Sequence, residues 1–125
     1  MINADFWRGR RVFLTGHTGF KGAWLAFWLR RMGAQVAGYS IDVPTDPSLF
    51  MSLRLTDDIA HIEGDVRDYG ALSKALADAN PEIIIHAAAQ SLVRKSYDHP
   101  VETFETNVMG TVNLLQAARQ LADLR

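Results

Sequence analysis

The sequence predicts an α/β fold in which a doubly wound parallel sheet has the strand order 3-2-1-4. Two observations lead to this prediction: short apolar segments alternate with helical patterns along the chain, and a GxxGxxG glycine motif follows the first apolar segment. Alternating strands and helices favour parallel strands joined by right-handed crossovers, because this arrangement buries near-continuous apolar strands. The doubly wound rule then gives the strand order and places a ligand crevice between strands one and four.

The first predicted strand and helix flank the glycine motif. Residues 11–14 form an apolar run typical of a buried strand, and residues 23–32 form a helical pattern that Gly33 ends. Apolar residues occur on every side of this helix, so it must be covered on two faces. We therefore expect Trp24 and Trp28 to lie in the core rather than against a ligand.

The glycine motif itself predicts a phosphate site. Gly16 permits a tight turn, Gly19 leaves the backbone open to a pyrophosphate, and Gly22 lets the helix pack closely on the strand. The free N–H groups and the positive dipole end at the helix start stabilise an anion there. Lys21 adds charge to the same site.

The second predicted strand, residues 35–40, ends near an acidic residue. Asp42 follows Gly22 by twenty positions, which is the expected place for a carboxylate that accepts hydrogen bonds from an adenosine ribose. Such a carboxylate would repel a 2′-phosphate, so the pattern favours NAD over NADP. The alternative is a glycine-rich turn followed by a solvated aspartate.

A long loop and a third strand come next. Pro47 and the apolar residues after it predict a short helical turn that Asp46 caps. Residues 59–64 form a modest third strand. Asp65 lies at the carboxyl end of that strand. Its side chain either contacts the amino group of an adenine or makes hydrogen bonds within the local turn.

Two further segments complete the predicted sheet. Asp68 has the position of an N-cap for a helix over residues 71–79. Residues 81–86 form the clearest strand pattern, β-branched and continuous, and predict a strand buried on both faces. The small residues 87–89 leave room for a ligand to approach the backbone, whereas His86 is interpreted as a core residue with satisfied hydrogen bonds.

The last predicted element is one long helix over residues 98–124. Gly110 in its middle suggests close approach to a neighbour. Met109, Leu114 and Leu121 fall outside the predicted inward face, so a partner helix is expected. The three-four spacing predicts an inward face made of Val101, Phe104, Val108, Val112, Leu115 and Ala118.

Composition limits the partners and the cell compartment. The 125 residues suit one domain, and a net charge of −1 without runs of like charge argues against nucleic acid or an anionic membrane as a partner. The chain contains no cysteine and shows no metal-ligand cluster. It shows neither a signal-peptide pattern nor an apolar run long enough to cross a bilayer. We expect a soluble, cytoplasmic protein.

Five segments carry a resemblance to a known family: FWRGRRVFLTGHTGFKG (6–22), GYS (38–40), PSLF (47–50), GDVRD (64–68) and HAAAQSLVR (86–94). Together they resemble the N-terminal part of extended short-chain dehydrogenases/reductases, and they are most similar to the CDP-glucose 4,6-dehydratase family. The resemblance covers essentially the whole chain. GDVRD and the glycines are shared by the whole superfamily. HTGFKG, together with the FW that precedes it and the AQS turn, occurs in a much narrower group of proteins.

The resemblance implies a Rossmann domain over residues 1–125 that holds NAD tightly. The full-length enzyme would oxidise the sugar at C4, eliminate water across C5 and C6, and return the hydride to C6. This reaction would convert CDP-glucose to CDP-4-keto-6-deoxyglucose for surface-polysaccharide synthesis. The resemblance also implies a homodimer in which the helix 98–124 of each subunit enters a four-helix bundle.

The same resemblance implies roles for individual positions. The pyrophosphate would be held by Gly16, Thr18, Gly19, Phe20, Lys21 and Gly22. The ribose would meet Asp42, the adenine Asp65 and Val66, and the middle of the cofactor Ala87, Ala88 and Ala89, while Asn107 would fix the long helix to the turn after strand four. The nicotinamide or the substrate would face Gln90, Ser91, Val93 and Arg94. For Arg94 and Lys95, a solvated basic pair is an equal alternative.

No catalytic residue is expected within this chain. The catalytic Tyr-x-x-x-Lys of the family would lie beyond residue 125, because Tyr97 is followed by Val101 where lysine is needed, and Tyr39 and Tyr69 fail the same test. The chain alone should bind cofactor without catalysis. The alternatives are a nucleotide-sugar epimerase or another sugar-nucleotide dehydratase with the same half, and a non-catalytic NAD-binding module.

Overall fold

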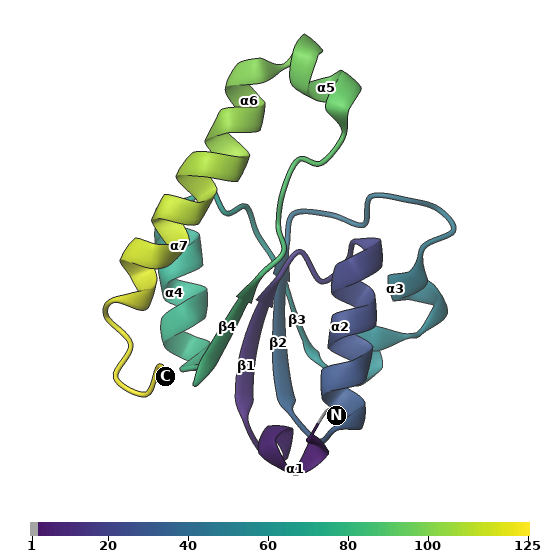
Figure 1. Ribbon diagram of the computed structural model, residues 1–125, viewed down its shortest axis with the longest axis vertical. Coiled ribbons are helices and arrows are strands. Elements are labelled where there is room, and N and C mark those ends of the chain that lie inside the picture. Colours follow the sequence, from purple (N-terminus) through teal and green to yellow (C-terminus); the bar gives the residue numbers. More distant parts are fainter. Residues whose placement is uncertain (1–2) are drawn as a thin grey trace.

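The computed structural model describes residues 3–125, so the first two residues of the predicted domain lie outside the described part. It contains a four-stranded parallel sheet with the order β3-β2-β1-β4 (Figure 1). The predicted fold class and strand order are therefore confirmed. The strands are β1 (Arg11–Thr15), β2 (Gln35–Ser40), β3 (Ala60–Glu63) and β4 (Ile83–His86).

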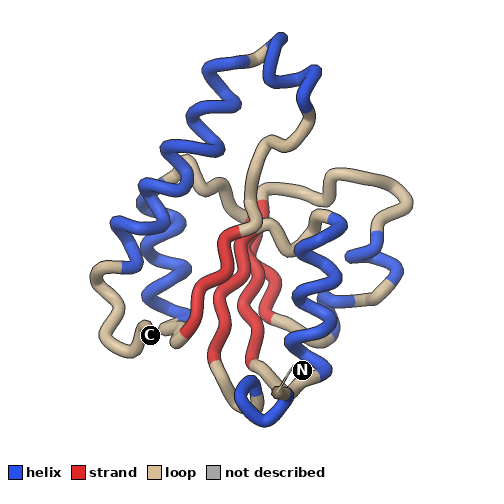
Figure 2. Tube along the Cα trace, in the orientation of Figure 1, coloured by secondary structure: helices blue, strands red, loops and turns tan. Residues whose placement is uncertain are grey.

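Helices cover both faces of the sheet (Figures 1 and 2). Neighbouring residues of β1 point to opposite faces, so Leu14 packs with Phe50 in one hydrophobic core while Phe13 packs with Leu76 in the other. The first core lies under α2 (Phe20–Arg31) and α3 (Leu49–Ser52), and the second under α4 (Tyr69–Ala79) and α7 (Gly110–Ala118). The short helix α1 (Ala4–Trp7) precedes β1.

The carboxyl ends of the central strands meet at one edge of the sheet. Thr15 at the end of β1 pairs with Tyr39 of β2 on one side and with His86 of β4 on the other. The segments that leave these strands therefore start next to one another. This is the edge at which a doubly wound sheet binds its ligand.

Helix α2 begins earlier than the sequence suggested. It starts at Phe20 with Gly19 as its N-cap, so the glycine motif itself forms the first turn. The predicted end at Gly33 is confirmed by a φ of +86° there, a conformation that glycine adopts without steric cost.

The short helix α3 is confirmed, but its predicted cap is wrong. Ser48 is the N-cap, and its hydroxyl accepts a hydrogen bond from the Met51 N–H at 3.1 Å. Asp46 lies too early, because an N-cap side chain must reach the N–H groups of the second or third helical residue. In α4 the predicted cap is confirmed: Asp68 accepts from the Ala71 N–H at 3.0 Å.

Strand β4 is only half-buried, so the prediction of burial on both faces is wrong. Within the described residues β4 is an edge strand that pairs with β1 alone. Its isoleucines still divide between the two faces: Ile83 and Ile85 pack against the first core and Ile84 against the second. The missing burial is therefore on the unpaired side of the strand.

The predicted helix over residues 98–124 is divided and shorter. Helix α5 (Val93–Asp98) is separate, while α6 (Pro100–Phe104), the π-helical turn η2 (Glu105–Met109) and α7 run on as one rod that ends at Ala118 (Figure 1). Rod here means residues 100–118. It extends beyond the carboxyl edge of the sheet, where α5 folds back beside it.

The predicted inward face of the rod is wrong. Its large residues Val101, Phe104, Val108, Val112 and Leu115 are between 48% and 70% exposed, and Ala118 is half-buried. The buried face of α7 consists of Gly110, Leu114 and Ala117. Close approach at Gly110 is confirmed, since a Cβ there would lie 2.6 Å from the Val66 side chain. Leu121, beyond the rod, packs against the second core.

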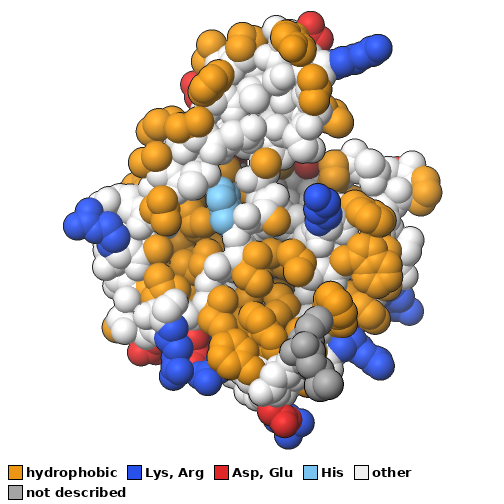
Figure 3. Space-filling model, viewed as in Figure 1, with side chains coloured by type: hydrophobic (Ala, Val, Ile, Leu, Met, Phe, Trp, Pro, Cys, Tyr) orange, Lys and Arg blue, Asp and Glu red, His pale blue; other side chains and the backbone are white. Residues whose placement is uncertain are grey.

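Helix α2 shows the same reversal. Trp24 and Trp28, expected in the core, are 47% and 54% exposed. The buried residues of this helix are mostly small, namely Gly22, Ala23, Ala26 and Leu29. An apolar groove of about 380 Å³ lies between α1, α2 and Ile85 of β4 and includes the Trp28 side chain. Hydrophobic side chains are visible over this region and along the rod (Figure 3).

Residues 3–125 contain neither a candidate membrane span nor a candidate metal cluster. None of the helices found there is long and apolar enough to cross a membrane. The same residues contain no group of three or more His, Cys, Asp or Glu side chains that could hold a metal ion.

Candidate cofactor site

The glycine loop connects β1 to α2 at the carboxyl edge of the sheet. Gly16 has a φ of +76°, and its N–H donates to the Tyr39 carbonyl at 2.8 Å. A Cβ on Gly16 would lie 2.7 Å from the backbone of Ala87 and Ala88. A side chain here would force apart the exits of β1 and β4, so the tight turn requires glycine.

The other two motif glycines differ in what surrounds them. A Cβ on Gly22 would lie 2.0 Å from the Gly16 carbonyl oxygen, so the protein's own packing requires glycine there. A Cβ on Gly19 would meet only that same oxygen, at an ordinary contact distance of 3.5 Å. No side chain of the described chain caps α2, which leaves the N–H groups of its first turn for an anion.

Thr15 organises the exit of β4. Its buried hydroxyl accepts from the N–H groups of Ala87 and Ala88, both at 3.1 Å, and lies 2.6 Å from His86 Nδ1. The hydroxyl has one proton, which it donates to Nδ1, so Nε2 carries the ring proton and donates to the Thr111 hydroxyl at 3.1 Å. The predicted hydrogen-bond satisfaction of His86 is confirmed, but its predicted place in the core is wrong, because the side chain is only half-buried on the edge strand β4. This partial burial lowers the pKa of His86.

Asn107 holds the chain after β4 from the other side. Its Oδ1 accepts from the Gln90 N–H at 2.8 Å, and its Nδ2 donates to the Gln90 carbonyl at 3.0 Å. This two-way contact joins the rod to the turn after β4, as the family resemblance implies. The backbone of Ala87, Ala88 and Ala89 therefore runs between two anchors.

Thr18 and Asp42 meet at the exit of β2. Thr18 is 3% exposed, and its hydroxyl contacts Ser40 Oγ at 2.7 Å and donates to the Asp42 carbonyl. The Thr18 side chain is thus engaged within the protein, which leaves its backbone for a phosphate. The Asp42 side chain is exposed beside the glycine loop, so its carboxylate is accessible to a ligand.

Asp65 makes the local turn contacts that were one of its two expected roles. Its Oδ1 accepts from the Arg67 N–H at 2.8 Å, and the Arg67 guanidinium lies 2.6 Å from Oδ2. Hydrogen bonds from Arg67 hold the pKa of Asp65 below its ordinary value. The Asp65 side chain remains 27% exposed, whereas that of Val66 is buried under the rod.

His17, within the glycine loop, has a structural role that sequence reasoning did not assign. Its ring is fully buried, lies edge-on to Phe50 with centroids 5.3 Å apart, and places Nε2 2.7 Å from Nδ1 of His61 on β3. Burial and the neighbouring His61 lower the pKa of His17 to about 4. The neutral ring therefore ties the glycine loop to α3 and β3. The available signal was Gly38 on β2, whose missing side chain makes room for the ring.

The positions expected near the substrate lie on and before α5. Gln90 folds back, and its side-chain amide bonds to the Leu92 backbone and to Thr103. Ser91, Val93 and Arg94 are exposed, and α5 projects beyond the carboxyl edge of the sheet (Figure 1). The ammonium group of nearby Lys95 forms an ion pair with Glu102 at 2.9 Å. Of the basic pair Arg94 and Lys95, Lys95 is therefore already engaged within the protein.

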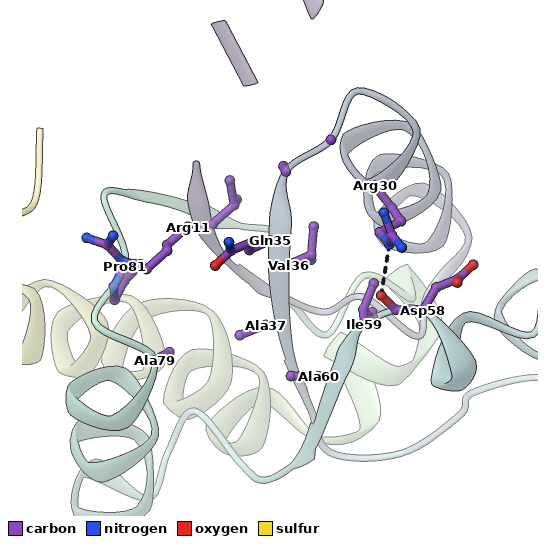
Figure 4. A pocket seen from close by; sticks show the side chains of 13 residues that line it. Arg11, Arg30, Gln35, Val36, Ala37, Asp58, Ile59, Ala60, Ala79 and Pro81 are labelled. Atoms are coloured by element: carbon purple, nitrogen blue, oxygen red, sulfur yellow. Dashed lines mark hydrogen bonds between the residues drawn. The ribbon is translucent and has the colours of Figure 1, made fainter. Parts of the chain in front are cut away.

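A cavity of about 540 Å³ lies at the opposite, amino-terminal end of the sheet (Figure 4). Gln35, the first residue of β2, is part of its lining. Arg30 donates to the Asp58 carbonyl at 3.1 Å, and Arg11 donates to the Asn80 carbonyl at 2.7 Å. Both guanidinium groups are engaged with the protein, and the glycine loop is at the other edge. This cavity is therefore separate from the candidate cofactor site.

Comparison with known proteins identifies the family. The sequence pattern of the GDP-mannose 4,6 dehydratase family matches residues 13–125. The chain belongs to this family. It is 54% identical over 125 residues to CDP-glucose 4,6-dehydratase of Salmonella typhimurium, an alignment that covers 100% of this chain and 35% of that protein. It is 36% identical over 115 residues to UDP-glucose 4-epimerase of Mycolicibacterium smegmatis, covering 92% of this chain and 36% of that protein.

A solved structure of a UDP-glucose 4-epimerase has a similar fold. The UDP-glucose 4-epimerase of Thermus thermophilus, determined in complex with NAD, superposes with a TM-score of 0.79 and 31% identity over 89% of this chain and 34% of that chain. The resemblance to extended short-chain dehydrogenases/reductases is confirmed. The chain spans about a third of the length of these family members.

Proposed function

We propose that this chain is the NAD-binding part of a nucleotide-sugar dehydratase that converts CDP-glucose to CDP-4-keto-6-deoxyglucose. The observation that carries the proposal is the contrast within the glycine loop: Gly16 and Gly22 are required by internal packing, whereas the space outside Gly19 is open. A glycine that the fold itself does not need is best explained by a ligand that approaches its backbone. The 54% identity to CDP-glucose 4,6-dehydratase supports the choice of substrate.

The residues present fit NAD. The first turn of α2, from Gly19 to Lys21, would hold the pyrophosphate, the exposed Asp42 carboxylate would accept from the adenosine ribose, and Asp65 would face the adenine. The backbone of residues 87–89 would lie along the middle of the cofactor. Bound NAD would accept a hydride from the sugar and later return it. This chain's own part would be to bind and orient the cofactor, because the catalytic residues are expected beyond residue 125.

A nucleotide-sugar epimerase is the second candidate, supported by the similarity to the Mycolicibacterium epimerase at 36% identity. The higher identity to the Salmonella dehydratase favours dehydration. A non-catalytic NAD-binding module is the third candidate. It predicts that even the full-length protein binds NAD without converting a nucleotide sugar.

We also propose that the full-length protein is a homodimer in the cytoplasm, where NAD and nucleotide sugars are found. Most of the large apolar residues of the rod face outward, whereas its buried face consists of Gly110, Leu114 and Ala117. An exposed apolar face of this kind favours association with another apolar surface. A second copy of the same rod is the partner that the resemblance implies.

Mass spectrometry of the full-length protein incubated with CDP-glucose distinguishes the candidates. A dehydratase releases a product lighter by one water molecule, an epimerase leaves the mass unchanged and produces an isomer, and a binding module gives neither. Titration calorimetry of the 125-residue chain with NAD tests the cofactor assignment separately. Loss of one water from CDP-glucose together with heat of NAD binding supports the proposal, and absence of NAD binding contradicts it.

A further inference from the structure

The turn after β3 is held in place by its backbone. The hydroxyl of Tyr39 donates to the Asp65 carbonyl at 3.1 Å, and the Asn113 side chain donates to the carbonyls of Val66 and Arg67 at 3.0 and 3.2 Å. These contacts come from β2 and α7, on two sides of the turn. The backbone here is therefore positioned without help from the Arg67 side chain.

The Arg67 side chain does something else: it folds back over Asp65. Its Nε lies 3.1 and 2.9 Å from the two carboxylate oxygens, and a terminal nitrogen lies 2.6 Å from Oδ2. Its other terminal nitrogen is 4.0 Å from Glu105 of the π-helical turn. A two-pronged guanidinium contact fixes the plane of a carboxylate, which a lysine ammonium cannot do.

We propose that Arg67 is a positioning residue for base recognition: it fixes the Asp65 carboxylate so that the lone pair left unoccupied meets a 6-amino purine and rejects a 6-keto purine. The inference rests on the proposed function, since it takes NAD as the ligand at this edge. A carboxylate only accepts hydrogen bonds, so it favours the amino group of adenine and repels the carbonyl oxygen of hypoxanthine. Without the Arg67 side chain, only the Arg67 backbone N–H at 2.8 Å from Oδ1 remains to orient the carboxylate. The carboxylate is then less ordered before the ligand arrives, and the free energy of ordering it reduces the affinity.

The rival explanation is an ordinary ion pair at the surface. Both side chains are about one-third exposed, at 33% for Arg67 and 27% for Asp65, and such pairs contribute little to stability. Both explanations predict a folded Arg67→Met variant, so stability cannot separate them. Discrimination between two bases can, because an ion pair with no ligand role leaves that ratio unchanged.

The experiment measures the affinities of the 125-residue chain for NAD and for nicotinamide hypoxanthine dinucleotide by calorimetry. We expect the unmodified chain to prefer NAD by about tenfold or more, the effect of one hydrogen bond to a charged group. Arg67→Met should reduce this preference to about threefold or less, with an unchanged melting temperature. Arg67→Lys is the second variant and should also show a reduced preference, because it keeps the charge but not the two-pronged contact.

Two further variants separate the possible failures. Lys74→Met breaks the exposed pair with Asp78 on α4, and it should leave the preference unchanged. Asp65→Asn should abolish or reverse the preference, since an amide can donate to the 6-keto oxygen. The role of Arg67 is refuted, while NAD binding stands, if Asp65→Asn alters the NAD preference but Arg67→Met keeps the preference of the unmodified chain. Should Arg67→Met not fold, Arg67→Lys replaces it in this comparison. If the unmodified chain binds no NAD, the proposed function itself fails.

Discussion

Gly38 and His17 share one space: a Cβ on Gly38 would lie 2.3 Å from Cγ of the His17 ring. The ring fills the volume that a side chain on β2 would otherwise occupy. Because the ring also contacts Phe50 and His61, the absence of one side chain on β2 allows the glycine loop to be joined to two other elements.

The first prediction tests this relationship with a double-mutant cycle. Gly38→Ala should lower the free energy of unfolding by roughly 1–3 kcal/mol, because it overpacks a filled site. In a His17→Ala background the same change should cost less than about 0.5 kcal/mol, since the space is then vacant. Urea unfolding followed by circular dichroism gives both values. Gly70→Ala, at an uncrowded position, is the control, and equal costs of Gly38→Ala in both backgrounds would argue against a shared space.

The second prediction concerns acid. Burial and His61 lower the pKa of His17 from 6.5 to about 4, so the unfolded chain binds more protons than the folded chain between these values. Stability should therefore be complete above pH 6.5 and fall as the pH approaches 4, by on the order of 3 kcal/mol. Burial lowers the pKa of His86 too, in the same direction. Denaturation at several pH values should show a flatter profile for His17→Gln than for the exposed control His99→Gln; equal slopes would exclude His17 as the cause.

The third prediction separates the roles of Gly19 and Gly22, the second and third glycines of the motif. Gly19→Val should abolish NAD binding with little effect on the melting temperature, because its side chain fills only the space outside the loop. Gly22→Ala should destabilise the fold itself, since its Cβ would lie 2.0 Å from the Gly16 oxygen. Calorimetry and thermal unfolding of both variants supply the comparison. Normal NAD binding by Gly19→Val would leave the loop as a turn without a ligand.

The fourth prediction concerns the choice between NAD and NADP. The exposed Asp42 carboxylate should accept from the ribose hydroxyls of NAD and repel the 2′-phosphate of NADP. We expect at least tenfold tighter binding of NAD, and a much smaller ratio in Asp42→Ala, because the repulsion is removed. Calorimetry with both cofactors measures the ratio, and Asp46→Ala in the same loop is the control. A ratio that Asp42→Ala does not change would assign the preference elsewhere.

The fifth prediction concerns association through the rod. The chain should self-associate, because Phe104 and Leu115 are 68% and 63% exposed on its outer side. Leu115→Asp, or Met109→Lys at a half-exposed position, should shift sedimentation towards monomer without lowering stability. Leu121 is unsuitable for this test despite its apparent place outside the inward face, because it packs against the second core. A monomer for both the unmodified chain and the full-length protein would contradict the dimer.

Much of the architecture was predictable because it follows from patterns that repeat along the sequence. The alternation of strand and helix patterns determines a parallel sheet, and the glycine spacing places a tight turn at its carboxyl edge. The spacing of apolar residues did not predict which face of each helix is buried. In α2 and α7 the buried positions are held by glycine, alanine and leucine, because the backbones approach closely. A hydrophobicity pattern does not distinguish the buried Leu114 from the exposed Leu115, and it gives Trp24 a high weight although that side chain is 47% exposed.

Other features could not be predicted because they depend on contacts between residues that are distant in sequence. Ser48 replaces Asp46 as a cap through a shift of two positions, which local patterns do not resolve. The contact of His17 with His61 joins residues separated by 44 positions, and no spacing rule connects them. Asn107 was placed correctly only through the resemblance, since its partner is the backbone of Gln90.

The π-helical turn Glu105–Met109 allows the two ends of the rod to be oriented independently. Each residue of an α-helix advances the side chains by about 100°. The wider π turn alters that rotation between α6, whose Thr103 contacts Gln90, and α7, which packs on α4. Replacing one side chain within the turn leaves this angular offset intact. Deleting one residue from it would rotate one end by about a quarter of a revolution relative to the other. The number of residues in this short segment is therefore constrained as well as the identity of Asn107 within it.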